Sequence, residues 1–309
     1  MSLKTITTPI YDRYSKAIGA VDFPATLDIE LTNNCNVDCV MCSRSRMKRQ
    51  IGSMDAALLE KIADEVRSYP VRSIGLHLFG EPLTHPDPVR MIRIVKERVP
   101  GASLLLSTNA CLLTPEISRR IVASGLDRIR FSLDGLDPSV YENLRRGSDF
   151  NRVMDNITEF IRIRDAAGAS RPSIQMQVIE MRDTAPQIGR YRRFWKPVLG
   201  ADDRIIVQKF VTFGGKVPDR TRFGMASVRD RLKRRLPCLR LWKNLVIYWD
   251  GRVSACCYDY DGECLAGDVK SNTICEIWKG PKMNEMRRAQ LAGEKAKNAL
   301  CGSCVAQAC

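Results

Sequence analysis

Three cysteines near the start of the chain are the residues best suited to chemistry. Cys35, Cys39 and Cys42 fall within eight residues, in a C-x3-C-x2-C pattern. Three thiolates at this spacing can surround one metal centre but leave its fourth position open, whereas a structural zinc site is normally closed by a fourth Cys or His. The chain has only two histidines, His77 in an apolar strand and His85 beside prolines, and we assign both to structural roles. The triad therefore favours an iron–sulfur cluster with one iron free for an outside ligand.

The remaining cysteines are concentrated at the far end of the chain. Of twelve cysteines, eight lie between residues 238 and 309, and none lies between 112 and 237. Twelve are too few for a disulfide scaffold in a chain of 309 residues, so their clustering indicates metal binding. Four of them form a candidate four-thiolate site: Cys238, Cys256, Cys301 and Cys304. A set of four thiolates with a C-x2-C pair is also a standard zinc signature, so zinc is the alternative here.

The charge and hydropathy of the chain indicate which classes of partner it can bind. The net charge of +14 favours anionic partners, but the basic residues are spread along the sequence, so we do not expect nucleic-acid binding. No apolar run approaches the roughly 20 residues of a membrane-spanning helix, and the polar N-terminus lacks a signal-peptide core. We therefore expect a cytoplasmic protein without membrane attachment.

From about residue 24 the sequence alternates between strand and helix signals. Six strands are expected, at residues 25–31, 73–79, 104–107, 128–133, 174–179 and 204–208. Helices are expected at 53–66, 89–99, 114–125, 138–146, 151–167 and 184–197, with Ser53 and Thr114 as caps. Six β-α units predict an α/β fold with a parallel sheet, and roughly 190 residues are too few for a closed eight-unit barrel. We therefore predict a partial (β/α)6 barrel with its chemistry at the carboxyl ends of the strands.

Near residue 215 this alternation stops. Gly214-Gly215 and Pro218 interrupt it, and residues 245–256 around Asp250-Gly251 predict a β-hairpin, followed by helical segments at 273–278 and 281–293. The predicted organisation is an N-terminal extension at 1–23, the partial barrel at 24–215 and a small α+β domain at 216–309.

The triad and the segments at the strand ends together resemble the radical S-adenosylmethionine (SAM) superfamily. Phe79-Gly80-Glu81-Pro82 is similar to the Gly-Gly-Glu-Pro motif of that family and departs from it at Phe79. The resemblance implies that the backbone of this motif and Glu81 bind the methionine ammonium of SAM. The other SAM contacts that it implies are Ser107 and Asn109 at the ribose, Ser132 and Arg145 at the methionine carboxylate, and Met41 beside the adenine.

The chemistry of this family depends on the open iron of a [4Fe–4S] cluster. The amine and carboxylate of SAM bind that iron, one electron cleaves the sulfonium, and the resulting 5′-deoxyadenosyl radical abstracts hydrogen from an unactivated C–H bond. The cofactor performs this step, while the protein positions the substrate and excludes solvent. The implied protein partner is an external electron donor such as a flavodoxin or a ferredoxin.

The distal cysteines resemble the SPASM extension found in the same superfamily. Cys238 and Cys256, with Gly251 between them, match its opening, but only Cys309 follows the final C-x2-C pair. The resemblance is therefore to the shortened twitch form, in which the four-thiolate set holds one auxiliary [4Fe–4S] cluster. Two [4Fe–4S] clusters are implied, with zinc as the alternative at the second site.

Enzymes with this short two-cluster arrangement include those that resemble the butirosin aminocyclitol dehydrogenase and the aminoglycoside epimerases. The implied function is hydrogen abstraction from a carbohydrate-like or other natural-product substrate, followed by dehydrogenation or epimerisation. The alternative within enzymes is radical modification of a ribosomally made peptide. An alternative of another class is a non-catalytic iron–sulfur or zinc protein that binds nucleic acid.

Epimerisation requires a hydrogen atom returned from the opposite face, and a cysteine S–H can supply it. Cys257 and Cys264 are the candidates. If residues 258–263 connect a hairpin, these two lie across from each other on one face, while Cys256 points to the other. The alternative is that both are packing residues.

Overall fold

A single curved sheet runs through the molecule. The computed structural model describes residues 22–217, 237–302 and 304. The sheet has nine strands in the order β11-β10-β9-β1-β3-β4-β5-β7-β8. Its six barrel strands are parallel to their neighbours: β1 (Thr26–Ile29), β3 (Ser73–Leu76), β4 (Ser103–Thr108), β5 (Arg128–Ser132), β7 (Ser173–Glu180) and β8 (Arg204–Lys209). The expected partial barrel of six β-α units is confirmed.

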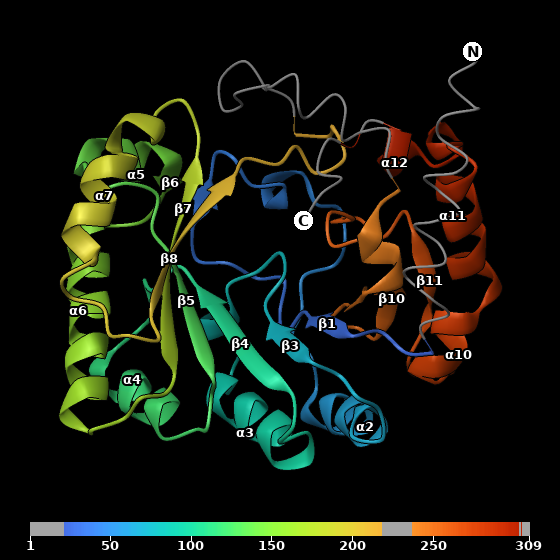
Figure 1. Cartoon of the computed structure of the whole chain (residues 1–309), viewed down its shortest axis with the longest axis horizontal. Helices are drawn as coiled ribbons and strands as arrows, with labels where there is room; N and C mark the ends of the chain where they lie inside the picture. Colours follow the sequence, from blue (N-terminus) through green and yellow to red (C-terminus); the bar gives the residue numbers. More distant parts are fainter. Residues whose placement is uncertain (1–21, 218–236, 303, 305–309) are drawn as a thin grey trace.

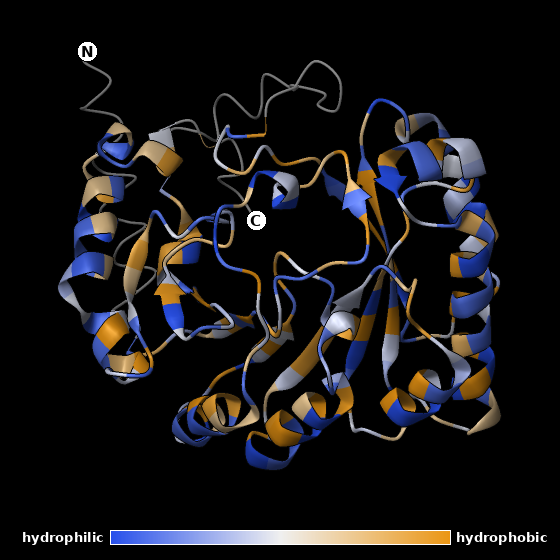
Figure 2. Ribbon diagram, turned by 180° about the vertical axis from the view of Figure 1, so that it is seen from behind, coloured by the Kyte–Doolittle hydropathy of each residue, from blue (hydrophilic) through white to orange (hydrophobic). Residues whose placement is uncertain are grey.

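The barrel helices form an outer layer around the convex side of the sheet (Figure 1). They are α2 (Ala56–Val66), α3 (Pro88–Arg98), α4 (Pro115–Val122), α5 (Pro138–Leu144), α6 (Phe150–Ala166) and α7 (Ile188–Trp195). Figure 2 shows hydrophobic and hydrophilic residues alternating along these helices, as in helices buried on one side. The strands contribute fully buried side chains to this core, among them Ile74, Leu104, Ile129 and Ile174. The residues between them on each strand face the lumen of the barrel.

One of the two expected helix caps is wrong. Thr114 caps α4, accepting a hydrogen bond from the backbone N–H of Ile117 at 3.2 Å. Helix α2, however, is capped by Asp55, whose side chain accepts from the backbone N–H of Ala57 at 2.7 Å. Ser53 instead forms an antiparallel bridge with Thr32. The residues before α2 are therefore paired with the segment that follows β1. Because of this pairing the helix begins only at Ala56.

The C-terminal part extends the barrel sheet instead of forming a separate one. Strand β9 (Asn244–Ile247) pairs in parallel with β1, and β10 (Arg252–Ser254) and β11 (Leu265–Asp268) continue outward as antiparallel strands. The hairpin expected around Asp250-Gly251 is the β9–β10 pair. Helices α10 (Ile274–Lys279), α11 (Pro281–Leu291) and α12 (Ala299–Gly302) cover this region. The division at residues 215 and 216 stays a prediction.

No helix in the described ranges is long and apolar enough to cross a membrane.

Candidate active site

The cysteine triad lies on the segment that follows β1. Cys39 belongs to the short strand β2 (Asp38–Cys39), which pairs antiparallel with β6 (Arg145–Arg146) so that Cys39 lies opposite Arg145. Burial, and then repulsion between neighbouring thiolates, raises the pKa of Cys39 to about 12. Burial likewise raises the pKa of Cys35 to about 11, with Cys42 contributing. The three thiols thus share one low-dielectric site, where a bound cation would stabilise their thiolate forms.

Each sulfur of the triad has an N–H donor nearby. Arg145 Nη1 lies 3.8 Å from Cys39 Sγ, the backbone N–H of Arg44 lies 3.4 Å from Cys42 Sγ, and Asn109 Nδ2 lies 4.0 Å from Cys35 Sγ. Among the described residues, no three Cys, His, Asp or Glu side chains converge on one metal ion. In a four-iron cluster each thiolate binds a different iron, so three thiolates can hold three irons and leave the fourth open to an outside ligand.

The segment containing Gly80 and Glu81 holds the triad loop in place. The backbone N–H of Glu81 donates to the carbonyl of Asn34 at 2.8 Å. A Cβ on Gly80 would lie 2.2 Å from the carbonyl oxygen of Thr32 and 2.5 Å from that of Asn34. Glycine is therefore required here by the close approach of the loop.

The buried carboxylate of Glu81 joins the ends of two strands. Its Oε1 accepts from Thr108 Oγ1 at 2.7 Å and from the backbone N–H of Leu83 at 3.1 Å. Its Oε2 accepts from the backbone N–H of Asn109 at 2.7 Å. Burial raises the pKa of Glu81, and these hydrogen bonds oppose the shift. Because a carboxylate offers about four acceptor sites, Glu81 can still accept one more donor, as its expected contact with the SAM ammonium requires.

Arg145 has a partner that the sequence analysis did not identify. Its guanidinium forms a buried ion pair with Asp134, with Nη2 and Nε at 2.7 and 3.0 Å from Oδ2. Asp134 Oδ1 in turn accepts from the backbone N–H of Ile179 at 2.7 Å. Since Nη1 also lies 3.8 Å from Cys39 Sγ, Arg145 contacts an expected cluster ligand as well as lying where the SAM carboxylate is expected. No local sequence signal connects Asp134, Arg145 and Cys39.

The other expected SAM contacts lie at the same edge of the sheet. Ser107 on β4 and Ser132 on β5 are half-buried on the lumen side of their strands. Asn109 follows β4, and its Nδ2 donates to Asn36 Oδ1 at 3.0 Å, on the triad loop. Met41 is buried in a small cluster with Leu144 and Met181, together with other apolar side chains. Their contacts with SAM stay predictions.

Phe79, where the motif departs from the family pattern, has a packing role. Its side chain is buried in a cluster with Val246, Tyr248 and Tyr260. Its ring centroid lies 6.3 Å from that of Tyr260, which meets it edge-on, and 6.3 Å from that of Phe213. The large side chain therefore joins the barrel to the C-terminal strands.

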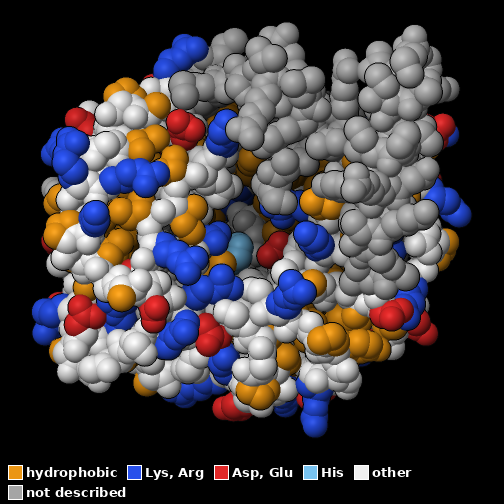
Figure 3. All heavy atoms as spheres, viewed as in Figure 1, with side chains coloured by type: hydrophobic (Ala, Val, Ile, Leu, Met, Phe, Trp, Pro, Cys, Tyr) orange, Lys and Arg blue, Asp and Glu red, His pale blue; other side chains and the backbone are white. Residues whose placement is uncertain are grey.

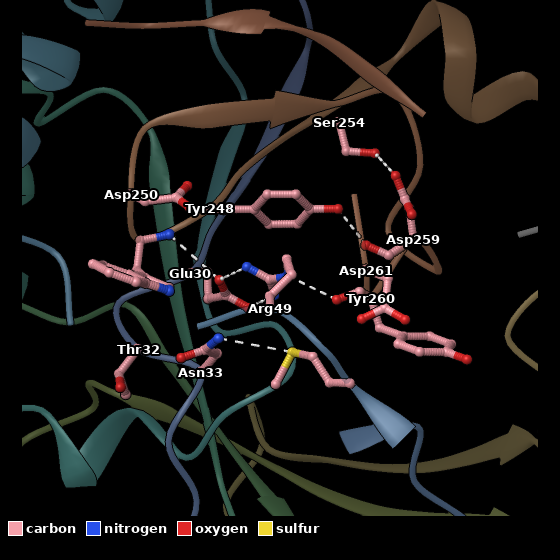
Figure 4. A network of polar contacts seen from close by, with 12 residues as sticks. Glu30, Thr32, Asn33, Arg49, Tyr248, Asp250, Ser254, Asp259, Tyr260 and Asp261 are labelled. Carbon is pink, nitrogen blue, oxygen red and sulfur yellow. Dashed lines mark hydrogen bonds and ion pairs between the residues drawn. The ribbon is translucent and has the colours of Figure 1, made fainter. Parts of the chain in front are cut away.

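A buried ion pair reinforces this junction (Figure 4). Arg49, which follows the triad, binds Glu30 in a two-pronged pair at 2.7 and 2.9 Å. Arg49 Nε also donates to the carbonyl of Tyr260 at 2.7 Å, and the guanidinium lies 3.9 Å from the centre of the Tyr248 ring. Glu30 accepts the backbone N–H of Trp249 at 3.3 Å. The triad loop, β1 and the C-terminal hairpin are therefore connected through two side chains that the sequence analysis missed.

The four distal cysteines influence one another electrostatically. Burial raises the pKa of Cys256, and the thiols of Cys238 and Cys304 raise it further. Burial raises the pKa of Cys301 to about 12, again with contributions from Cys238 and Cys304. Burial lowers the pKa of Lys295, while the nearby cysteines oppose that shift. The four expected ligands are thus within electrostatic reach of one another, beside a cation that could balance a thiolate-bound cluster.

The expected pairing of Cys257 with Cys264 is not formed. The connection between β10 and β11 runs from 255 to 264, longer than the expected 258–263. Asp259 shapes it by accepting from Ser254 Oγ at 2.8 Å and from the backbone N–H of Cys264 at 2.7 Å. The Cys264 sulfur lies 3.2 Å from Asn298 Nδ2, on the side of Cys301. Cys257 instead packs against the cluster that contains Phe79.

Comparison with protein families agrees with this geometry. Residues 29–164 match the radical SAM superfamily, and residues 238–305 match the SPASM iron–sulfur cluster-binding domain. The tungsten-containing aldehyde ferredoxin oxidoreductase cofactor-modifying protein of Pyrococcus furiosus is 27% identical over 297 residues, covering 84% of this chain and 82% of that protein. The mycofactocin maturase MftC of Mycobacterium tuberculosis is 25% identical over 331 residues, covering 97% of this chain and 80% of that protein.

Solved structures share the architecture at low sequence identity. BtrN in complex with AdoMet and 2-DOIA superposes with a TM-score of 0.62 at 18% identity, covering 91% of this chain and 92% of BtrN. Streptococcus suis SuiB bound to S-adenosylmethionine superposes with a TM-score of 0.70 at 16% identity, covering 90% of this chain and 71% of SuiB. The motifs, the strand ends that carry them and both domain matches agree, and the chain therefore belongs to the radical SAM superfamily, with a C-terminal iron–sulfur cluster-binding domain of the SPASM type.

Proposed function

We propose that this enzyme abstracts a hydrogen atom from a small, polar, carbohydrate-like molecule held in the barrel lumen, leading to dehydrogenation or epimerisation. The observation that carries this proposal is the polarity of the lumen. Asp28, His77, Arg130, Gln175 and Gln177 occupy the strand faces opposite the buried apolar residues. Figure 3 shows a hollow in this face of the molecule with Lys and Arg side chains, a carboxylate and a histidine around it. Such a lining offers donors and acceptors to a hydroxyl-rich substrate.

His77 is the proposed acceptor of a substrate proton. A Cβ on Gly75 would lie 2.6 Å from His77 Cε1 and 3.0 Å from Asp28 Oδ1, so the ring lies over Gly75 beside Asp28. Its Nδ1 is buried and has no hydrogen-bond partner among the described residues. Burial lowers the pKa of His77, and the nearby Arg130 and Arg128 lower it further, while Asp28 opposes the shift. A neutral ring with a free nitrogen can accept a hydroxyl proton when an alcohol carbon is oxidised.

The cofactors in this proposal are SAM and two [4Fe–4S] clusters. Cys35, Cys39 and Cys42 would hold the first cluster, and Cys238, Cys256, Cys301 and Cys304 the auxiliary one. When bound, SAM and the first cluster supply a 5′-deoxyadenosyl radical that abstracts hydrogen, and the auxiliary cluster supplies an electron acceptor. Glu81 and Arg145 orient the methionine part of SAM, and a flavodoxin or ferredoxin is the external electron donor.

For epimerisation, Cys257 is favoured over Cys264 as the hydrogen donor. Cys257 packs against the cluster that contains Phe79, next to the proposed SAM site, whereas the Cys264 sulfur contacts Asn298 beside the auxiliary cysteines. In this proposal the Cys257 S–H bond breaks and its hydrogen atom forms the new C–H bond on the opposite face of the substrate. The thiyl group is then reduced by the external electron donor and takes a proton from solvent.

The test is anaerobic incubation of the reconstituted enzyme with SAM, a reductant and candidate sugars, in H2O and in D2O. Dehydrogenation gives 5′-deoxyadenosine and a ketone in equal amounts. Epimerisation gives an inverted product with one deuterium from D2O, and Cys257→Ala abolishes the inversion while 5′-deoxyadenosine still forms. Absence of any sugar-dependent 5′-deoxyadenosine would contradict the proposal.

Modification of a ribosomally made peptide is the second candidate. The match to mycofactocin maturase MftC, which covers 97% of this chain, favours it. The same assay with precursor peptides separates the two candidates, because only the true substrate stimulates the formation of 5′-deoxyadenosine above the uncoupled rate.

A further inference from the structure

A second cleft lies at the end of the barrel away from the cysteine triad. Its volume is about 330 Å³. Five of its lining residues are the first residues of consecutive sheet strands: Ser73, Ser103, Arg128, Ser173 and Arg204. The triad follows the carboxyl end of β1, whereas this cleft opens at the amino ends of β3, β4, β5, β7 and β8. It therefore opens at the opposite end of the barrel from the triad, although Gln175 lines both this cleft and the lumen.

The cleft is strongly cationic. Four arginines line it (Arg72, Arg128, Arg171 and Arg204), against a single carboxylate, that of Asp202. Within the described part of the chain, no carboxylate oxygen lies within the 4.0 Å ion-pair distance of any of these four guanidinium groups. Their positive charges are therefore not neutralised by direct pairing, and the potential in the cleft favours an anion.

The side chain of Arg128 can donate a further hydrogen bond inside this cleft. Its Nη2 donates to Ser73 Oγ at 2.7 Å, while its Nε is buried and has no hydrogen-bond partner in the part of the chain that the structure describes. Burial lowers the pKa of Arg128, and the neighbouring Arg171 and Arg204 lower it further, although Asp127 opposes this. A buried N–H without an acceptor costs free energy, and a bound oxyanion would recover that cost.

We propose that this cleft binds the phosphate group of a phosphorylated ligand. Guanidinium groups match phosphate oxygens in geometry and charge, and the serine hydroxyls at the strand starts add short-range donors. The several arginines against one aspartate suit a dianion better than a single carboxylate. The phosphate comes either from a phosphorylated sugar or from free inorganic phosphate. The site requires no turnover, so it stands independently of the proposed reaction.

Calorimetric titration of the reconstituted full-length protein with inorganic phosphate, in a buffer without other multivalent anions, tests the site. We expect Arg128→Gln/Arg204→Gln to bind phosphate at least about tenfold more weakly, because two charge-assisted contacts are lost. Arg119→Gln on the exposed side of α4 is the matched control and should bind like the wild type. Arg204→Gln alone, at an exposed position, should weaken binding without affecting folding.

The outcome that overturns the proposal is phosphate binding that is absent in the wild type or equal in the wild type and the double variant. A second titration uses a nucleoside diphosphate sugar. If it displaces phosphate and depends on Arg204, the cleft takes a phosphate group carried by a sugar. If only inorganic phosphate binds, the cleft takes the free anion. Both titrations measure binding alone. The phosphate site can therefore be refuted while the proposed reaction holds, and the proposed reaction can be refuted while phosphate still binds.

Discussion

At the scale of single residues, the environment of a side chain decides its role more than its type does. His77 shows this, since a histidine in an apolar strand is normally a packing residue. Here alternation along the strand directs it into the lumen, where its Nδ1 has no hydrogen-bond partner within the described ranges. His85, by contrast, uses both ring nitrogens, at Met54 O and the backbone N–H of Asp87.

The lowered pKa of His77 predicts a specific pH dependence of stability. The unfolded chain binds a proton at His77 near pH 6.5, while the folded protein does so only at lower pH, because of burial and of Arg130 and Arg128, which outweigh Asp28. This group therefore adds no instability above pH 6.5 and destabilises the fold as the pH falls below it. We expect wild type to lose about 1 kcal/mol more than His77→Gln between pH 7.5 and 5.5, measured by urea unfolding. Identical losses in wild type and His77→Gln would contradict the prediction.

At the scale of elements, the triad loop is shaped by its neighbours. Ser53 bridges Thr32, Glu81 bonds Asn34, and β2 pairs with β6. The loop has little regular structure of its own, so its shape depends on these contacts.

Gly80→Ala should displace the triad loop. The added Cβ would lie 2.2 Å from the backbone oxygen of Thr32, and backbone cannot give way as a flexible side chain can. We expect a loss of about 1–3 kcal/mol in the free energy of unfolding and a lower iron content after reconstitution. Gly101→Ala is the matched control, because a Cβ there meets nothing within 4 Å. Equal iron content in both variants would refute the role of Gly80.

Arg49→Met should be among the most damaging substitutions outside the triad. It leaves the Glu30 carboxylate, which is 0% exposed, without its ionic partner at the junction of β1 and the C-terminal hairpin. We expect a loss of about 3–5 kcal/mol at neutral pH, shrinking toward acid pH because protonation neutralises Glu30. The control Arg162→Met breaks an exposed pair with Glu159, which solvent screens, and should cost far less than Arg49→Met. Denaturant unfolding of both variants measures the difference, and similar costs would show that burial of the pair is unimportant.

At the scale of the whole molecule, one sheet links the two segments that contain the cysteine sets. Because β9 pairs with β1 from Thr26 to Ile29, the distal cysteines are connected to the barrel through backbone hydrogen bonds. The buried Phe79 cluster and the Arg49–Glu30 pair lie at the same junction. The two cysteine sets are therefore joined by one sheet, but no cysteine is shared between them.

Separate ligands predict separable iron contents. Anaerobic reconstitution should give about eight irons per chain, from two four-iron clusters. Replacing Cys35, Cys39 and Cys42 together by Ala should leave about half of the iron and abolish SAM cleavage, because the distal four thiols are untouched. Cys111→Ala, at a buried cysteine outside both sets, should keep the full content. Iron and 5′-deoxyadenosine assays provide the measurements, and a triple variant with full iron would refute the assignment.

Short-range pattern alone determined much of this protein. The six barrel strands, the triad spacing, the Thr114 cap and the motif at Gly80 and Glu81 were all readable, because periodicity and local spacing are properties of neighbouring residues. The family resemblance followed from the order of these segments along the chain.

Only the tertiary structure decided which distant residues meet. The pairing of Arg145 with Asp134 and Cys39, the Arg49–Glu30 pair and the packing of Phe79 join segments whose spacing carries no periodic signal. The Ser53 cap and the Cys257–Cys264 pairing failed for the same reason, since a bridge to Thr32 and the hydrogen bonds of Asp259 replaced the expected local geometry. Strand register and loop closure set these contacts, and both depend on the free energy of the whole fold, which local sequence does not reveal.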